Sequence, residues 1–347
     1  MFLTKSIRAY INDYTQVKEL SLRSRITIPA ALHELLCPEI MPIEISSDLP
    51  ISTGDGTLIY NSYIYICSRS IPTKVARIKL TDYTDATVKT IPNSNNADAI
   101  VQIGEFIWIG CFDTGMVYQL DPDSLEVLSS YMGFVTTGTS LWRSTGVNAM
   151  CADDQYIYIG GWDGSFAKHT VSNGYNFFVP GVVTGYVHSL CEDEVCLYGH
   201  SNYGMQHIVF KLLKYDMTLL RSISGPDIFH DDIVQDKDYI YMAKQGLHRF
   251  SKVDLSETVL PLPGMIDGLA MNEGYIFATP SEYSTKCDIH VIDLKKFELD
   301  HTVTIKGIPD NKRTNDILID GEFLHLTRWT NRVVRLVRLN LGRIVRG

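Results

Sequence analysis

The 347-residue sequence predicts an all-β fold, a closed ring of seven similar sheets, and two repeated patterns support this prediction. In the first, two large residues stand two positions apart, and successive pairs begin 43, 50, 40, 43, 36 and 48 residues apart. In the second, a polar residue stands eight positions before each pair. A period of about 40–50 residues is typical of one four-stranded propeller blade. The pairs are Tyr63/Tyr65, Phe106/Trp108, Tyr156/Tyr158, Cys196/Tyr198, Tyr239/Tyr241, Tyr275/Phe277 and Phe323/His325.

Residues 1–50 do not follow the repeat, and they predict a short, partly helical arm. Ser6–Leu22 and Ala30–Leu36 are the candidate helices. The last repeat has three clear strands, and only Arg343–Val345 remains for a fourth. Because a strand from one terminus commonly completes the blade built by the other, we expect Ile43–Ser46 to dock as the outer strand of the final blade. The predicted division is a docking arm over 1–40 and a seven-bladed β-propeller over 41–347.

The stretch Asp98–Val117 illustrates the repeated unit. An apolar run through Ile103 is followed by a Gly-Glu turn, and Phe106–Ile109 then predicts a strand buried on both faces. A third strand ends at an Asp. An acid or amide ends most third strands, and we expect each to accept hydrogen bonds in the turn to the fourth strand. These residues are Asp82, Asp121, Asp216, Asp254, Asp293 and Asn340.

The composition restricts the function. The net charge of −9 argues against general binding of nucleic acid. The seven Cys form no C-x-x-C pair, and four of them stand at fixed offsets from the repeat aromatics, which predicts buried free thiols in a reducing compartment. The four are Cys67, Cys111, Cys151 and Cys191. The sequence has no basic-then-apolar leader and no apolar run of 18 residues, which indicates cytoplasmic synthesis without a signal peptide or membrane span.

The polar residue of each repeat begins the inner strand, and the inner strands of a propeller line its central channel. Seven such residues would form a ring at the channel mouth: Asp55, Asp98, Asn148, His188, Asp231, Asp267 and Asn315. Their oxygen atoms could hold Ca²⁺ or Mg²⁺. Alternatively, each residue caps the start of its strand and solvates a water-filled channel. Asp232 follows Asp231 and would point to the opposite face of the strand.

Two further groups of residues invite a functional interpretation. Six arginines and no acid occur near the C-terminus, so a local anionic partner could bind there, although Arg side chains that cover strand edges explain the same pattern. They are Arg328, Arg332, Arg335, Arg338, Arg343 and Arg346. The pair His200 and His207 is expected to be surface polar rather than a metal site. The long insert Gly133–Gly146 carries Trp142 and is a candidate functional loop.

Repeats such as NAMCADDQYIYIGGWDG and DGLAMNEGYIFAT resemble those of seven-bladed propellers of the YVTN, NHL and surface-layer type, and the resemblance covers residues 51–347. The WD40 signature is absent, because no Trp-Asp pair closes a third strand. A resemblance to propeller lactonases and lyases would imply a bound metal, but the Glu that those sites usually carry on an inner strand is missing from the ring. In architecture the chain is also similar to the propellers of some phage tail-nozzle proteins.

Two functions from different classes follow. The first is a non-enzymatic binding or assembly protein that uses its propeller faces and terminal arms to join other protein subunits in a larger complex, such as a virion or phage tail. The alternative is a metal-dependent small-molecule enzyme, lactonase- or lyase-like, with its site at the channel mouth. No nucleophile elbow, phosphate-binding loop or dinucleotide fingerprint occurs in the sequence. The sequence therefore favours the first function, without a required cofactor.

Overall fold

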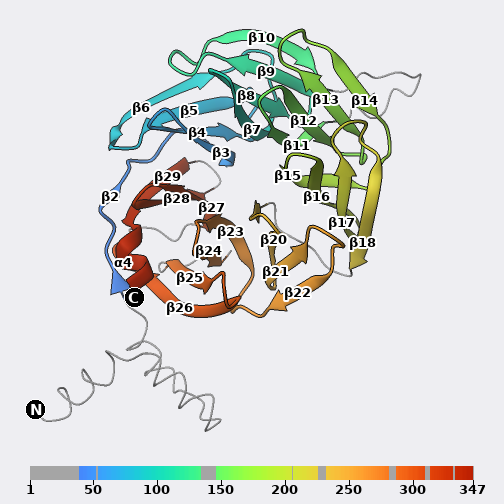
Figure 1. The fold of residues 1–347 in the computed structure, drawn as a ribbon. Coiled ribbons are helices and arrows are strands. Elements are labelled where there is room, and N and C mark those ends of the chain that lie inside the picture. Colours follow the sequence, from blue (N-terminus) through green and yellow to red (C-terminus); the bar gives the residue numbers. More distant parts are fainter. Residues whose placement is uncertain are drawn as a thin grey trace, which may run out of the picture.

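The computed structural model describes residues 39–51, 54–133, 146–204, 206–225, 232–280, 287–308, 313–330 and 333–346. Over these ranges the chain forms seven sheets arranged around a central channel (Figure 1). Each sheet is one blade, and its first strand lies nearest the channel. The predicted all-β, seven-bladed propeller is confirmed. The two candidate helices, Ser6–Leu22 and Ala30–Leu36, lie outside the described residues.

The first three blades each contain four antiparallel strands in sequence order. Blade 1 consists of β3 (Gly54–Tyr60), β4 (Tyr63–Ser68), β5 (Lys74–Lys79) and β6 (Asp82–Thr90). Blade 2 consists of β7 (Ala97–Ile103), β8 (Phe106–Cys111), β9 (Met116–Leu120) and β10 (Val127–Met132). Blade 3 consists of β11 (Val147–Ala152), β12 (Tyr156–Gly161), β13 (Phe166–Thr170) and β14 (Asn176–Val179).

The next two blades repeat this order. Blade 4 consists of β15 (Tyr186–Glu192), β16 (Cys196–Tyr203), β17 (Gln206–Leu213) and β18 (Leu219–Gly225). Blade 5 consists of β19 (Ile233–Gln235), β20 (Tyr239–Lys244), β21 (Gly246–Ser251) and β22 (Glu257–Leu260). In every repeat the predicted aromatic pair begins the second strand. These strands are buried because sheets pack against each other on both of their faces.

The last two blades receive strands from the N-terminal side of the chain (Figure 1). Blade 6 consists of β23 (Ile266–Met271), β24 (Tyr275–Pro280), β25 (Cys287–Asp293) and β26 (Glu298–Ile305), with β1 (Glu39–Ile40) parallel to β26. Blade 7 consists of β27 (Arg313–Asp320), β28 (Phe323–Thr330), β29 (Val333–Asn340) and, at its outer edge, β2 (Glu44–Ile45). The segment Arg343–Val345 is not a strand, because it lies in the helix α4 (Leu341–Arg346).

Polar contacts join blade 7 to blade 1, where the ring closes. Glu44 of β2 accepts a hydrogen bond from the backbone N–H of Tyr83 at 2.8 Å and pairs with Arg338 of β29 at 2.7 Å. The Tyr83 hydroxyl lies 2.5 Å from Nδ1 of His325 in β28. Burial, together with the nearby Arg338 guanidinium, lowers the pKa of His325 to about 4. This imidazole is therefore neutral near pH 7, and the short strand β2 is held by side chains as well as by backbone pairing.

The cores lie between neighbouring blades. One cluster, for example, packs Tyr65 and Cys67 of blade 1 against Ile107 and Ile109 of blade 2. The predicted burial of thiols is confirmed for Cys67, Cys111 and Cys151, whereas Cys191 is half-buried. All six predicted acids or amides at the ends of third strands accept a backbone N–H two or three residues later, at 2.7–3.1 Å. No helix in the described part of the chain is long and apolar enough to cross a membrane.

Candidate functional site

The ring positions coincide with a backbone irregularity. In six blades the pairing of the first strand with the second skips one residue, which produces a β-bulge near the start of the strand. The skipped residues are Asp55, Asp98, Asn148, His188, Asp267 and Asn315. A bulge leaves its extra residue unopposed by the partner strand and turns its side chain away from the regular pleat. In these six blades the polar repeat of the sequence therefore marks the point where the inner strand departs from regular pairing.

Three of the ring residues face one another at the mouth of the channel. Asp98, Asn148 and His188 line the same cavity, on blades 2, 3 and 4. Asp267 is buried in β23 and is not among the residues that line it. The side chains of Asp55 and Asn315, and the whole of Asp231, lie outside the described residues. In blades 5 and 7 the carboxylates on the cavity belong to the neighbouring residues Asp232 and Asp316.

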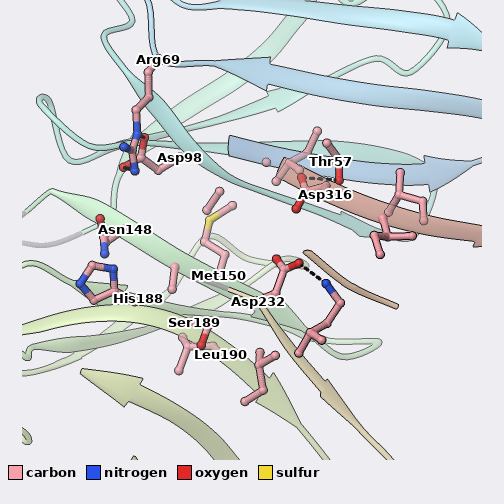
Figure 2. A pocket seen from close by; sticks show the side chains of 18 residues that line it. Thr57, Arg69, Asp98, Asn148, Met150, His188, Ser189, Leu190, Asp232 and Asp316 are labelled. Atoms are coloured by element: carbon pink, nitrogen blue, oxygen red, sulfur yellow. Dashed lines mark hydrogen bonds and ion pairs between the residues drawn. The ribbon is translucent and has the colours of Figure 1, made fainter. Parts of the chain in front are cut away.

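The channel cavity has a volume of about 280 Å³. Figure 2 shows Arg69 next to Asp98 and Asn148 next to His188 along one side, with Asp232 and Asp316 farther along. The Asp232 carboxylate accepts the backbone N–H of Leu269 at 2.7 Å, and Asp316 accepts the hydroxyl of Thr57 at 2.8 Å. These bonds tie the inner strands of neighbouring blades to one another and fix the carboxylates in place.

The fit of this site to a metal ion can be tested on its donors. Nε and Nη2 of Arg69 donate to the two carboxylate oxygens of Asp98 at 2.7 and 3.2 Å, so a guanidinium already neutralises this acid. Nδ2 of Asn148 donates to the Val187 carbonyl at 2.5 Å. Among the described residues, no three His, Cys, Asp or Glu side chains come together as metal ligands. The cation in the ring stays a prediction that would depend on Asp55, Asp231 and Asn315.

A second cavity of about 310 Å³ opens beside the first. Its outer wall is aromatic: Phe112 stacks on Trp162 with ring centroids 4.3 Å apart and planes 28° apart, and Trp162 meets Tyr186 edge-on at 4.8 Å. Trp162 remains 40% exposed. We call this cavity the mouth pocket. It is lined by Arg69, Asn96, Asp98, Phe112, Asn148, Trp162, Tyr186 and His188.

Local sequence explains why Trp162 reaches the rim. The β12 strand ends at Gly161, and the backbone N–H of Ser165 donates to the Asp163 side chain at 3.0 Å, which forms a tight Asx turn. Gly164 has a φ of +75°, and a Cβ there would lie 1.8 Å from the Val183 carbonyl oxygen. Only glycine fits at this position, so the turn packs directly on the segment that leads into blade 4.

The aromatic wall was missed by the sequence reasoning, although a signal for it exists. Arg69, Phe112 and Trp162 each stand six residues after the first member of their aromatic pair. They therefore occupy one equivalent position in three successive blades, at the turn between the second and third strands. The predicted functional loop Gly133–Gly146, with Trp142, cannot be compared, because residues 134–145 lie outside the described part of the chain.

A row of histidines extends from the pocket into blade 4. The rings of His188 and His200 are parallel within 10° with centroids 5.3 Å apart, and His207 follows at 6.3 Å from His200. The Ser189 hydroxyl lies 2.8 Å from Nδ1 of His200. The prediction that His200 and His207 are surface polar is wrong, because both are fully buried. They lie on adjacent paired strands, β16 and β17, whose faces are covered by neighbouring blades.

The arginines near the C-terminus are largely engaged within the protein. Arg335 pairs with Asp48 at 2.8 Å, Arg338 pairs with Glu44, and Arg328 is buried. Arg343 is exposed on α4. Arg332 and the side chain of Arg346 lie outside the described residues. An anionic partner at this tail stays a prediction.

No protein-family profile and no curated protein sequence matches the chain. Solved structures do. A chain of the mitotic checkpoint complex superposes with a TM-score of 0.69 at 12% identity, covering 86% of this chain and 92% of that one. The Neurospora crassa Pan2 WD40 domain gives 0.66 at 12% identity, covering 83% and 89%. BamB from Moraxella catarrhalis gives 0.52 at 15% identity, covering 83% and 85%. These similarities show that the chain has the propeller fold of such proteins, although it lacks the WD40 sequence signature.

Proposed function

We propose that this protein is a non-enzymatic binding and assembly protein, which holds a ligand in the mouth pocket and joins a larger complex through its other surfaces. The observation that carries the proposal is the aromatic wall of half-buried Phe112 and Tyr186 and exposed Trp162, beside the fixed polar side chains of Arg69 and Asp98. Aromatic residues and arginine dominate the energetic centres of binding sites. A pocket of about 310 Å³ lies at the small end of the range known for ligand sites.

The opposite face offers a surface for assembly. Val195, Tyr215 and Val253 stand at turns after first or third strands, so all three lie at the end of the blades away from the mouth. Tyr215 is 82% and Val253 is 84% exposed. The backbone N–H of Lys214, next to Tyr215, donates to the Val195 carbonyl at 2.9 Å, so the turns that carry Val195 and Tyr215 are neighbours. Exposed apolar groups that gather in this way are typical of contact surfaces between proteins.

The N-terminal arm would add a second attachment. Its last two residues form β1, which pairs with the outer strand of blade 6, and the chain then continues into β2 at the outer edge of blade 7. In this proposal the complex is a virion, a phage tail or another particle of many subunits; the tail resemblance rests on architecture alone.

Photo-crosslinking tests the use of both faces. A photoreactive amino acid at Tyr203, exposed at the end of β16, reports on the mouth side, and the same group at Tyr215 reports on the opposite side. In cells that produce the complex, we expect an adduct at each position, with different molecules attached. Absence of any adduct at both positions would contradict the proposal.

Deletion of residues 1–40 tests the arm. Because β2 begins at Glu44, the truncated chain keeps the strand that completes blade 7. We expect it to fold, as measured by its circular dichroism and melting temperature, but to be absent from the purified complex. Incorporation equal to that of the full chain would show that the arm does not attach the protein.

A further inference from the structure

We infer that the mouth pocket binds a neutral saccharide, with a pyranose ring packed on Trp162 and its hydroxyls bonded to Asn148 and the Arg69–Asp98 pair. The inference rests on the proposed function, because it names the ligand class of the same pocket. The protein would then be an assembly component that recognises a glycan.

The aromatic wall suits a sugar ring. One face of a pyranose carries mainly C–H bonds, whose hydrogens bear partial positive charge, and the face of an aromatic ring is negative. Phe112 supports Trp162 from one side at a centroid distance of 4.3 Å, and Tyr186 meets it edge-on. The indole is thus held rigidly while 40% of Trp162 stays exposed. A rigid aromatic platform loses little conformational entropy when a ligand stacks on it.

The polar wall suits hydroxyl groups, which both donate and accept. The amide nitrogen of Asn148 is used by the Val187 carbonyl, while its carbonyl oxygen accepts no hydrogen bond from the described residues. This oxygen can accept from a ligand hydroxyl. Asp98 and Arg69 are locked together in a two-bond pair and present acceptor and donor edges of fixed geometry. A site of this kind discriminates strongly against ligands that lack the matching hydroxyls.

The charge of the pocket argues for a neutral ligand. Asp98 and Arg69 neutralise each other, and the side chain of Asp98 is only 5% exposed against 48% for Arg69. A cationic ligand would need an uncompensated carboxylate beside the rings. A nucleotide or other polyanion would meet a chain of net charge −9. A neutral saccharide requires neither an unpaired carboxylate nor a positively charged surface.

The two cavities together set the size of the ligand. The mouth pocket and the channel cavity share four lining residues, Arg69, Asp98, Asn148 and His188. A ligand stacked on Trp162 can therefore extend toward the channel, past Met150 and Ser189. With volumes of about 310 and 280 Å³, the two cavities provide room for an oligosaccharide of a few units rather than a single sugar.

The test uses a printed array of neutral and anionic oligosaccharides, followed by calorimetry with the best ligands on the full-length protein. We expect binding to neutral pyranose chains, weakened at least about tenfold in Trp162→Ala and in Asn148→Ala. Trp162→Phe should retain most of the affinity, since the platform remains. Tyr175→Ala, an equally drastic change at a 63% exposed residue in the turn after β13 on the opposite face, should bind as the wild type does. Circular dichroism of each variant shows whether it is folded.

The outcomes separate this inference from the proposed function. Binding of sulfated or sialylated chains alone, or neutral-saccharide binding that Trp162→Ala leaves unchanged, overturns the inference. An array without any bound saccharide, combined with a polypeptide adduct at Tyr203, also overturns it and leaves the proposed function standing. An array without binding, combined with no adduct at either photoreactive position, overturns both.

Discussion

The two faces of this propeller use the same repeat differently. On the face away from the mouth, three blades carry an identical arrangement: an Asp accepts two backbone N–H groups of its turn and the hydroxyl of a Tyr five residues later. We call these the Asp–Tyr ties. The hydroxyl distances are 2.7, 2.9 and 2.6 Å for Asp153/Tyr158, Asp193/Tyr198 and Asp236/Tyr241. On the mouth face, the position six residues after the start of each aromatic pair carries Arg69, Phe112 and Trp162 in blades 1, 2 and 3, one cationic residue and two different aromatic residues.

Lysines extend two of these ties across blade boundaries. Lys214 of blade 4 is buried between Asp153 of blade 3 and Glu192, at 2.7 Å from each. Lys252 of blade 5 approaches Asp193 of blade 4 in the same way, at 3.7 Å. Burial alone disfavours the Lys214 ammonium, but the two carboxylates outweigh it and raise its pKa. Charge and hydrogen bonding therefore connect blades 3, 4 and 5 on this face.

This difference between the two faces reflects two separate requirements of a repeated fold, contact between blades and contact with a ligand. Contacts between neighbouring blades must be made again at every boundary, so the residues that make them recur. A ligand touches each blade once, with a different part of its surface, so the residues that contact it need not resemble one another. In this protein, divergence at a repeat position coincides with the proposed binding surface, and recurrence coincides with contacts that join the blades.

The largest expected effect follows from removal of a carboxylate on the recurrent face. Asp153→Ala takes one of two carboxylates from the buried Lys214 and leaves the Tyr158 hydroxyl and two backbone N–H groups without their acceptor. The free energy of unfolding, from urea titration, should fall by about 3 kcal/mol. A change below about 0.5 kcal/mol would mean that the tie is not structural.

A fall in pH should reduce the free energy of unfolding through the same carboxylate, Asp153. Burial raises the pKa of Asp153, but Lys214, the two backbone N–H groups and the Tyr158 hydroxyl together lower it to about 2, from an ordinary value of 3.8. The carboxylate therefore stabilises the fold above about pH 4, and this contribution is lost as the pH falls toward 2. The loss amounts to about 2 kcal/mol.

Urea titrations between pH 5 and 2 measure this loss. The comparison variant is Asp153→Asn, which cannot ionise and should show a shallower decline of stability with falling pH than the wild type. Parallel declines in both proteins would assign the acid sensitivity to other groups.

A smaller effect is expected from a single hydrogen bond. Tyr198→Phe removes the hydroxyl that donates to Asp193 and leaves the ring and its packing in place. The free energy of unfolding should decrease by about 1 kcal/mol. Tyr118→Phe is a matched control in blade 2, where the hydroxyl donates to the Asn93 carbonyl rather than to an Asp. Its loss should be smaller, since the acceptor there is uncharged.

The sequence predicted the features that depend on periodicity. The aromatic pairs, and the polar residues eight positions before them, predict seven blades. The Asx turns follow from single residues such as Asp121 and Asp254. These features are local, so a single sequence carries them. The Asp–Tyr ties also have a sequence pattern, an Asp three residues before the aromatic pair. The connection of such a tie across a blade boundary, however, depends on a Lys from the next blade.

The mouth pocket could not be predicted in the same way. Its walls come from four blades, and its composition is irregular at equivalent positions, so no period indicates it. Asp232 and Asp316 line the channel where the periodic rule names Asp231 and Asn315. In blade 7 a bulge at Asn315 precedes Asp316, and the position of a bulge is set by pairing with the second strand rather than by the local sequence.

The smallest expected effect on stability belongs to the mouth, and it is the sharpest test of the comparison between the two faces. Trp162→Ala removes a side chain that is 40% exposed and whose contacts with Phe112 and Tyr186 are confined to the rim. The free energy of unfolding should fall by about 0.5 kcal/mol, against about 3 kcal/mol for Asp153→Ala on the other face. Both values come from the same urea titration at pH 7. A loss for Trp162→Ala as large as that for Asp153→Ala would mean that the aromatic wall is part of the structural core, and divergence among the repeats would no longer identify the binding surface.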